Sequence, residues 1–236
     1  MPAPPPRVIA FDGDDTLWRN EDVFTLSQTR YRAILSAHVD LDTHDLEARL
    51  AAVERRNLAT YGYGVKGFTL SMIETAIEIT QGAIPAGDIE VILRLGQAML
   101  VHPVEVLDGV VEVLETLTRR DHELWLITKG DLFDQESKIA RSGLEPFFTR
   151  LEIVSEKDQA AYRRILHRGG ADPAEFAMVG NTVRSDILPV LALGARAFHV
   201  PYHTTWAHEA ADAPEGHAGF VVLGSIAELP GALGAG

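Results

Sequence analysis

Six short, predominantly apolar runs recur along this sequence, and they constrain its fold more than any other feature. They cover residues 8–11, 124–127, 151–154, 176–179, 197–200 and 220–223. Runs of this length are typical of strands buried on both faces of a sheet. The segments between the later runs have helical spacing, for example Val110, Val113, Leu114 and Leu117. Strands that alternate with helices predict βαβ units and a doubly wound parallel sheet, an α/β Rossmann-like core.

Residues 19–102 interrupt this alternation, because no buried strand is evident among them. The pattern there predicts four amphipathic helices, at 22–38, 43–60, 68–80 and 86–101, separated by turn-forming residues. Four helices in this length make a small bundle. Since the bundle follows the first strand, we expect an α/β core of residues 1–18 and 103–236 with an inserted helical domain of residues 19–102.

The composition narrows the range of functions. The 236 residues include 34 acidic and 21 basic side chains, a formal net charge of −13, so nucleic acid and anionic membranes are not expected partners. The chain has no cysteine, which excludes disulfide frameworks, iron–sulfur ligation and thiol nucleophiles. No run resembles a signal peptide or reaches membrane-spanning length, so we expect a cytoplasmic protein. For its oligomeric state, a monomer and a homodimer both stay open.

Three carboxylates, Asp12, Asp14 and Asp15, directly follow the first apolar run. In open α/β sheets, ligands bind beyond the carboxyl ends of the strands. Crowded carboxylates repel one another unless a cation, a proton or hydrogen-bond donors compensate them, and Mg²⁺ prefers such oxygen ligands. Taken alone, the motif has a second interpretation, an acidic turn in which Asp15 caps the next helix.

Polar groups also follow the second, third and fourth apolar runs. The second run is followed by a hydroxyl and a glycine-rich turn before a helix, at Thr128, Lys129 and Gly130. The third is followed by a single ammonium, Lys157, and the fourth by an amide oxygen and a later carboxylate, Asn181 and Asp186. The first group suits a phosphate. Because a parallel sheet gathers its strand ends along one edge, we expect all four clusters to meet there. Together they are the parts that metal-assisted phosphoryl transfer requires.

In order and position these motifs resemble those of the haloacid dehalogenase superfamily of hydrolases. Residues 12–16 match its Asp-x-Asp-x-Thr motif, Thr128 its strand-ending Ser or Thr, and Lys157 its isolated Lys. Its fourth motif, Gly-Asp followed by a later Asp, is similar to Gly180-Asn181 followed by Asp186. The helical insertion lies where this family carries a cap domain. Two features depart from the family pattern: Asn181 supplies a neutral oxygen where a carboxylate is usual, and no proline follows the Lys157 motif.

The resemblance implies the catalytic and metal-binding roles. Asp12 would be the nucleophile that forms an aspartyl-phosphate, and Asp14 would be the general acid and then the general base. Mg²⁺ would bind Asp12, the main-chain carbonyl of Asp14, and an oxygen of Asn181 or Asp186. Relatives that cleave carbon–halogen bonds lack an acid at the position of Asp14, so the resemblance favours phosphomonoester hydrolysis.

The resemblance also implies the residues that bind the phosphate. Thr128 would donate a hydrogen bond to it, Lys129 and Gly130 would contribute main-chain amides, and Lys157 would form an ion pair with it. Caps in this family read the leaving group. On the loop expected at residues 61–67, Tyr63 and Lys66 are therefore candidates to contact the body of the substrate, and a plain helix–helix connection is the alternative.

These observations predict a Mg²⁺-dependent phosphatase that acts on a small phosphorylated metabolite. Phosphomutases also retain an acid at the position of Asp14, so transfer to a second hydroxyl is an alternative. Phosphoacceptor modules of the response-regulator receiver type gather similar groups at strand ends, but they are much shorter and lack the insertion. A catalytically impaired phosphate-binding relative, suggested by Asn181, is a third alternative.

Overall fold

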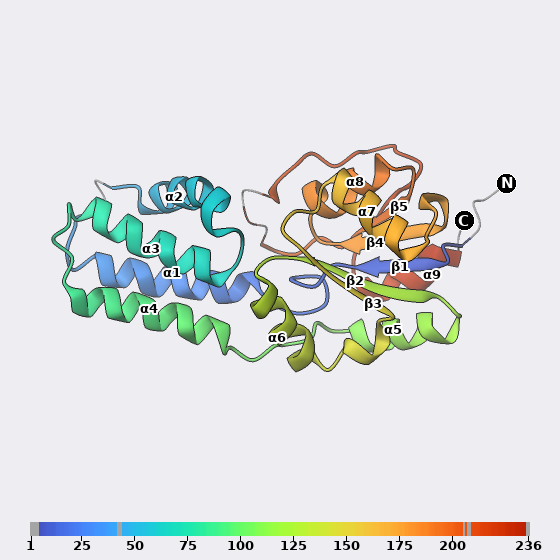
Figure 1. Cartoon of the computed structure of the whole chain (residues 1–236), viewed down its shortest axis with the longest axis horizontal. Coiled ribbons are helices and arrows are strands. Elements are labelled where there is room, and N and C mark those ends of the chain that lie inside the picture. The colour runs from blue at the N-terminus through green and yellow to red at the C-terminus, as the bar shows by residue number, and fades with distance from the viewer. Residues whose placement is uncertain (1–4, 42–43, 205, 207–208, 235–236) are drawn as a thin grey trace. The chain divides into compact units, whose positions relative to one another are not determined.

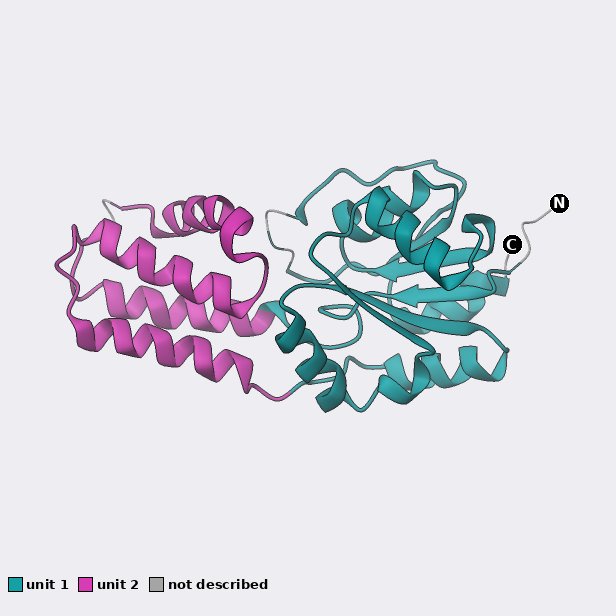
Figure 2. Cartoon of the chain, in the orientation of Figure 1, with its two compact units in different colours: residues 1–21, 104–236 teal, residues 22–103 magenta. Residues whose placement is uncertain are grey.

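The computed structural model describes residues 5–41, 44–204, 206 and 209–234. The chain divides into two compact units (Figure 2): a core unit, Met1–Glu21 with Val104–Gly236, and a helical unit, Asp22–Pro103. The division predicted from the sequence, 1–18 and 103–236 against 19–102, differs from this one by three residues at the first boundary and by one at the second.

The core unit contains a six-stranded parallel sheet with strand order β3-β2-β1-β4-β5-β6. The strands are β1 (Val8–Phe11), β2 (Glu123–Lys129), β3 (Arg150–Val154), β4 (Phe176–Gly180), β5 (Arg196–His199) and β6 (Phe220–Val222). Each of them lies on one of the six apolar runs, so the predicted α/β fold class is confirmed. Because β1 is paired on both sides, Asp12 lies near the middle of the edge formed by the carboxyl ends of the strands.

Helices cover both faces of this sheet (Figure 1). One face packs against α5 (Val110–Arg119), α6 (Leu132–Ser142) and α9 (Leu229–Gly234), and the other against α7 (Gln159–Gly169) and α8 (Leu188–Leu191). Side chains of β1 alternate between the two cores: Ile9 and Phe11 join the first, Val8 and Ala10 the second. Single-turn segments lie at Glu145–Phe147, Pro173–Glu175 and Ile226–Glu228, and a π-helical segment at Val183–Ile187.

Gly169, the last residue of α7, lies against Trp125 of β2. A Cβ atom at this position would stand 2.0 Å from Cη2 of the indole, which is fully buried. We expect Gly169→Ala to lower the free energy of unfolding by about 1–3 kcal/mol, measured by urea denaturation, because a packed core cannot absorb the extra atom. Gly231→Ala in α9, where a Cβ would meet nothing within 4 Å, is the control. Equal losses in the two variants would contradict the packing explanation.

The two chain segments that border the helical unit are paired with each other inside the core unit. Trp18 forms an antiparallel bridge with Val106. Next to it, the amide of Arg19 donates to the carbonyl of Glu105 at 2.9 Å. The segments that lead into and out of the insertion therefore lie side by side.

The helices of the insertion, as far as the structure describes them, are α1 (Glu21–Leu35), α2 (Leu46–Tyr61), α3 (Val65–Ile79) and α4 (Ala86–Leu100). They enclose an apolar core of their own, in which the Tyr31 hydroxyl donates to the Met72 carbonyl at 2.7 Å. The predicted start of the second helix, Thr43, lies outside the described residues. Within the described part of the chain, no helix is both long enough and apolar enough to cross a membrane.

The connection between α2 and α3 is shorter than the predicted loop at residues 61–67. Gly62 and Gly64, with φ angles of 69° and 108°, make the turn, and α3 begins at Val65. The predicted helix start at residue 68 was wrong because Gly67 is helical: a Cβ there would stand 2.8 Å from the Gly62 carbonyl oxygen. Glycine at this position thus serves close packing, and Lys66 lies in the first turn of α3.

Candidate active site

A buried cluster of charged side chains lies at the carboxyl edge of the sheet. Asp12 follows β1, Lys157 follows β3, and Asp186 lies in the π-helical segment after β4. The Lys157 ammonium forms an ion pair with Asp12 and a second one with Asp186, whose Oδ1 atom is 2.8 Å away. The exposed fractions of the three residues are 7%, 4% and 0%, in chain order. Three distant parts of the sequence thus contribute to one site.

One ammonium faces two carboxylates in this cluster, so the cluster carries a net negative charge when both carboxylates are ionised. Burial raises the pKa of Asp12 to about 7; Lys157 opposes this rise and Asp186 adds to it. Burial alone would lower the pKa of Lys157, but the two carboxylates raise it above its ordinary value. A further cation would relieve this imbalance.

Thr16 indicates where such a cation would fit. Its hydroxyl lies 3.3 Å from Oδ2 of Asp12 and 3.4 Å from Oδ1 of Asn181. A hydroxyl carries one proton and can donate to only one of the two oxygens at a time. The other oxygen is left short of a donor, and a hard cation that accepts carboxylate and carbonyl oxygens would satisfy both. The oxygens of Asp12 and Asn181 therefore fit Mg²⁺.

Asp186 is less suited than Asn181 to bind a cation directly, because protein donors already occupy its oxygens. Lys157 is paired with Oδ1, and Oδ2 accepts the amide and the hydroxyl of Thr182 at 3.0 and 2.8 Å. Among the described residues, no group of three or more His, Cys, Asp or Glu side chains is arranged to hold a metal ion. A cation beside Asp12 would accordingly need Asn181 and main-chain oxygens as well.

The carboxylate of Asp14 is held by donors from two parts of the chain. Trp18 Nε1 is 2.7 Å from Oδ1, and Gln135 Nε2 is 2.9 Å from Oδ2. Lys138 Nζ lies 3.0 Å from each oxygen and also 2.8 Å from Oδ1 of Asn20. The structure thus brings Asp14 to the same sheet edge as Asp12, but gives it a different cation.

Asp15, the third carboxylate of the motif, caps a helix. Its Oδ1 atom accepts the amides of Asn20 at 2.8 Å and Glu21 at 3.1 Å, where α1 begins. Burial raises the pKa of Asp15 to about 7, and the charge of Asp14 adds to the rise. The capping interpretation of the acidic turn therefore describes Asp15, although it does not account for Asp12 and Asp14.

In the predicted phosphate-binding turn after β2, several polar groups already have hydrogen-bond or ion-pair partners within the protein. Thr128 is buried, and its hydroxyl donates to Oε1 of Gln135 at 3.3 Å. The amide of Gly130 donates to the Val154 carbonyl at 3.2 Å, so it is committed to the sheet and is not directed at a ligand. The ammonium of Lys129 pairs with Glu209, which lies between β5 and β6.

Several buried or largely shielded polar residues of the site were not anticipated from the sequence. They are Gln135 and Lys138 on α6, and Ser185 with Glu209, which bind the Lys129 ammonium. The signal for the α6 pair was weak: the two residues are three positions apart on an amphipathic helix that follows a candidate phosphate turn. For Glu209, which lies in the long connection between β5 and β6, no local pattern could have indicated its partner.

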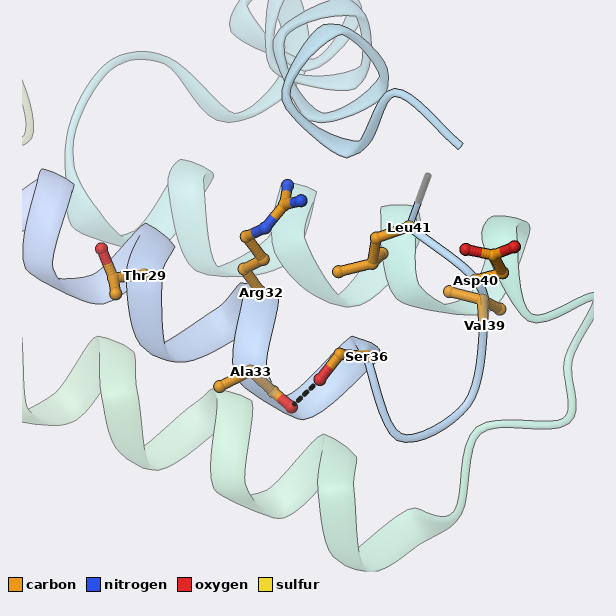
Figure 3. A pocket seen from close by; sticks show the side chains of 7 residues that line it. All are labelled: Thr29, Arg32, Ala33, Ser36, Val39, Asp40 and Leu41. Atoms are coloured by element: carbon orange, nitrogen blue, oxygen red, sulfur yellow. Dashed lines mark hydrogen bonds between the residues drawn. The ribbon is translucent and has the colours of Figure 1, made fainter. Parts of the chain in front are cut away.

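Tyr63 and Lys66 belong to the helical unit, where Tyr63 lies between α2 and α3 and Lys66 lies in the first turn of α3. That unit has a hollow of about 490 Å³, shown in Figure 3, which neither of them lines. Two of its polar side chains have partners within the unit: Arg32 pairs with Glu47 at 2.6 Å, and Ser36 donates to the Ala33 carbonyl at 2.8 Å. Contact of Tyr63 and Lys66 with a substrate stays a prediction.

Comparison with known proteins identifies the family. A family model for haloacid dehalogenase-like hydrolases matches residues 6–194. A crystal structure of a haloacid dehalogenase-like family hydrolase from Xanthomonas campestris is 44% identical, with a TM-score of 0.85, over 97% of this chain and 91% of its own. The magnesium-bound HAD-hydrolase YfnB from Bacillus subtilis, at 15% identity and a TM-score of 0.67, covers 97% of this chain and 99% of its own, and is similar in fold.

A curated relative matches a smaller part of the chain. The pyrimidine 5'-nucleotidase PynA from Streptococcus pneumoniae is 28% identical over 89 residues, which are 35% of this chain and 38% of that protein's length. The matched segment thus spans less than half of either protein. The family match covers all of β1 to β4 and the residues that gather at their ends, and the Xanthomonas structure covers nearly the whole chain. This chain belongs to the haloacid dehalogenase-like hydrolases.

Proposed function

We propose that this protein is a Mg²⁺-dependent phosphomonoester hydrolase that acts on a small phosphorylated metabolite. The observation that supports this most is the buried cluster of Asp12, Lys157 and Asp186, with Asn181 beside it. The net negative charge of this cluster would repel a phosphate unless a second cation compensated it, and Mg²⁺ is therefore part of the proposed site. Asp12, Asn181 and the main-chain carbonyl of Asp14 would hold that ion. When bound, it would neutralise charge on the phosphate.

The proposed reaction has two displacements. An oxygen of the Asp12 carboxylate attacks phosphorus, the bond from phosphorus to the leaving oxygen breaks, and Asp14 gives that oxygen a proton. Asp14, now ionised, then takes a proton from a water molecule that attacks the same phosphorus and breaks its bond to Asp12. Inorganic phosphate and the free alcohol are the products, and both aspartates return to their starting state. Lys157 and Thr128 would hold phosphate oxygens during both steps.

Several kinds of phosphate ester are candidate substrates. The partial similarity to a pyrimidine 5'-nucleotidase makes nucleoside monophosphates one candidate, beside sugar phosphates, phosphoglycolate-like acids and flavin mononucleotide. We propose that the helical unit acts as a cap that selects among them, with Tyr63 and Lys66 as contacts to the substrate body.

A panel of these phosphate esters, with p-nitrophenyl phosphate as a generic substrate, tests the proposal through the phosphate released. We expect continuous phosphate release with Mg²⁺. After chelation the rate should fall by at least about 10²-fold, because the metal would stabilise the transition state by several kcal/mol. Turnover that survives complete metal removal would contradict the proposal. Isomerisation without released phosphate would indicate a mutase, stoichiometric protein phosphorylation a phosphoacceptor, and binding alone an impaired relative.

A further inference from the structure

Gln135 and Lys138 lie three residues apart on α6, and both donate to the carboxylate of Asp14. Gln135 Nε2 is 2.9 Å from Oδ2, and Lys138 Nζ is 3.0 Å from both oxygens. Residues with this spacing share one face of a helix. Trp18 Nε1 adds a fourth hydrogen bond, at 2.7 Å from Oδ1. Each oxygen of Asp14 therefore accepts two hydrogen bonds, which fix its orientation; one of the four opens when Asp14 carries the proton that it is proposed to donate.

The ammonium of Lys138 is itself held in place and shielded. Its side chain is 12% exposed, against 22% for that of Asp14. Besides Asp14, it donates to Asn20 Oδ1 at 2.8 Å and lies 3.6 Å from Oδ2 of Asp134, one helical turn back. Exposed ion pairs rarely fix a geometry, whereas a shielded one with charge-assisted hydrogen bonds does. Lys138 is thus a rigid support and not a mobile surface charge.

Gln135 connects this support to the candidate phosphate site. While its amide nitrogen donates to Asp14, its Oε1 atom accepts the hydroxyl of Thr128 at 3.3 Å. Gly130 permits the approach, because a Cβ there would stand 3.0 Å from Gln135 Nε2. One face of α6 therefore sets the position of Asp14 relative to the hydroxyl that is proposed to bind phosphate.

We propose that Lys138 is a positioning residue that holds Asp14 for proton transfer to the leaving group, an inference that rests on the proposed role of Asp14 as acid and base. Lys138 acts through Asp14 and not on the reacting atoms. Small displacements of a catalytic group can cost about a hundredfold in rate. Loss of Lys138 should therefore impair the step that needs the Asp14 proton and spare a step that does not.

The leaving group separates these two cases. An alkyl alcohol leaves readily only if its oxygen is protonated as the bond to phosphorus breaks, whereas p-nitrophenolate leaves as an anion. The quotient kcat/KM reports the steps up to departure of the leaving group. It is therefore the quantity in which the two kinds of substrate should differ, even if hydrolysis of the aspartyl-phosphate limits kcat for both.

The test measures kcat/KM for p-nitrophenyl phosphate and for the alkyl phosphate that the wild type hydrolyses best. With the alkyl ester we expect Asp14→Asn to lose about 10²–10⁴-fold and Lys138→Met about 10–100-fold. With the aryl ester both should lose less than about fivefold. The double variant should be no worse than Asp14→Asn alone, and Lys138→Arg should recover part of the alkyl activity.

The controls separate this inference from a loss of folding and from the proposed function. Arg141→Met removes another cation from α6 and should change neither quotient, while thermal unfolding checks each variant. If Lys138→Met does not fold, Gln135→Leu replaces it, with the same pattern expected. Equal losses on both esters, additive losses in the double variant, or no leaving-group dependence in Asp14→Asn would each overturn the inference. Wild-type enzyme that hydrolyses no ester would instead overturn the proposed function.

Discussion

Asp12→Asn should abolish turnover of every phosphate ester, with kcat lowered on the order of 10⁴-fold or more, because the proposed first step has no other nucleophile. Steady-state phosphate release and the absence of a trapped phosphoenzyme would both report the loss. Asp121→Asn is the control: it makes the same chemical change at an exposed residue outside the site. Activity within tenfold of the wild type would contradict the assignment of Asp12.

The same variant should be at least as stable as the wild type. The buried cluster has two carboxylates for one ammonium, and Asp12→Asn leaves the Lys157–Asp186 pair balanced. Residues kept for catalysis at some expense of stability commonly behave in this way. A melting temperature clearly below that of the wild type would show that Asp12 is a structural partner of Lys157 first.

Lys157→Met should have the largest effect on stability. It leaves the carboxylates of Asp12 and Asp186 buried without their common cation, and breaking a buried ion pair in this way costs about 3–5 kcal/mol. We also expect kcat to fall by at least about 10²-fold, since the ammonium that is proposed to bind the phosphate is lost. Urea denaturation and phosphate release measure the two effects.

Two further variants locate the cause of that loss. Arg164→Met removes an exposed cation from α7 and should leave the free energy of unfolding nearly unchanged. Asp12→Asn combined with Lys157→Met should regain part of the lost stability, because only Asp186 is then left uncompensated. If the double variant is less stable than Lys157→Met alone, electrostatic imbalance is not the reason for the destabilisation.

The sheet could be predicted from the sequence because a strand buried on both faces must be apolar at successive positions, whatever surrounds it. All six strands followed from this requirement. The helical unit was less predictable at its boundaries. Gly64 ends a turn and Gly67 lies inside α3, where it packs against the Gly62 carbonyl, and the sequence does not distinguish these two uses of glycine.

The meeting of Asp12 with Lys157 and Asp186 could be anticipated because parallel strands place their carboxyl ends together. The partner of Asp14 could not be anticipated. Lys138 is 124 residues away and lies on an amphipathic helix, where a lysine is ordinarily exposed. The commitment of the Gly130 amide to Val154 also depends on how far β2 extends beside β3, which the apolar run alone does not reveal.

The pairing of Trp18 with Val106 has a consequence for how such a protein can change over evolution. The two ends of the insertion are paired within the core unit. The stability of the sheet should therefore depend little on the length and sequence of the chain between them. The helical unit is in this sense an exchangeable module: it can be enlarged, trimmed or replaced by another without relocating Asp12 or Asp14. If the helical unit selects the substrate as proposed, new substrate preferences can arise while the proposed catalytic residues stay in place.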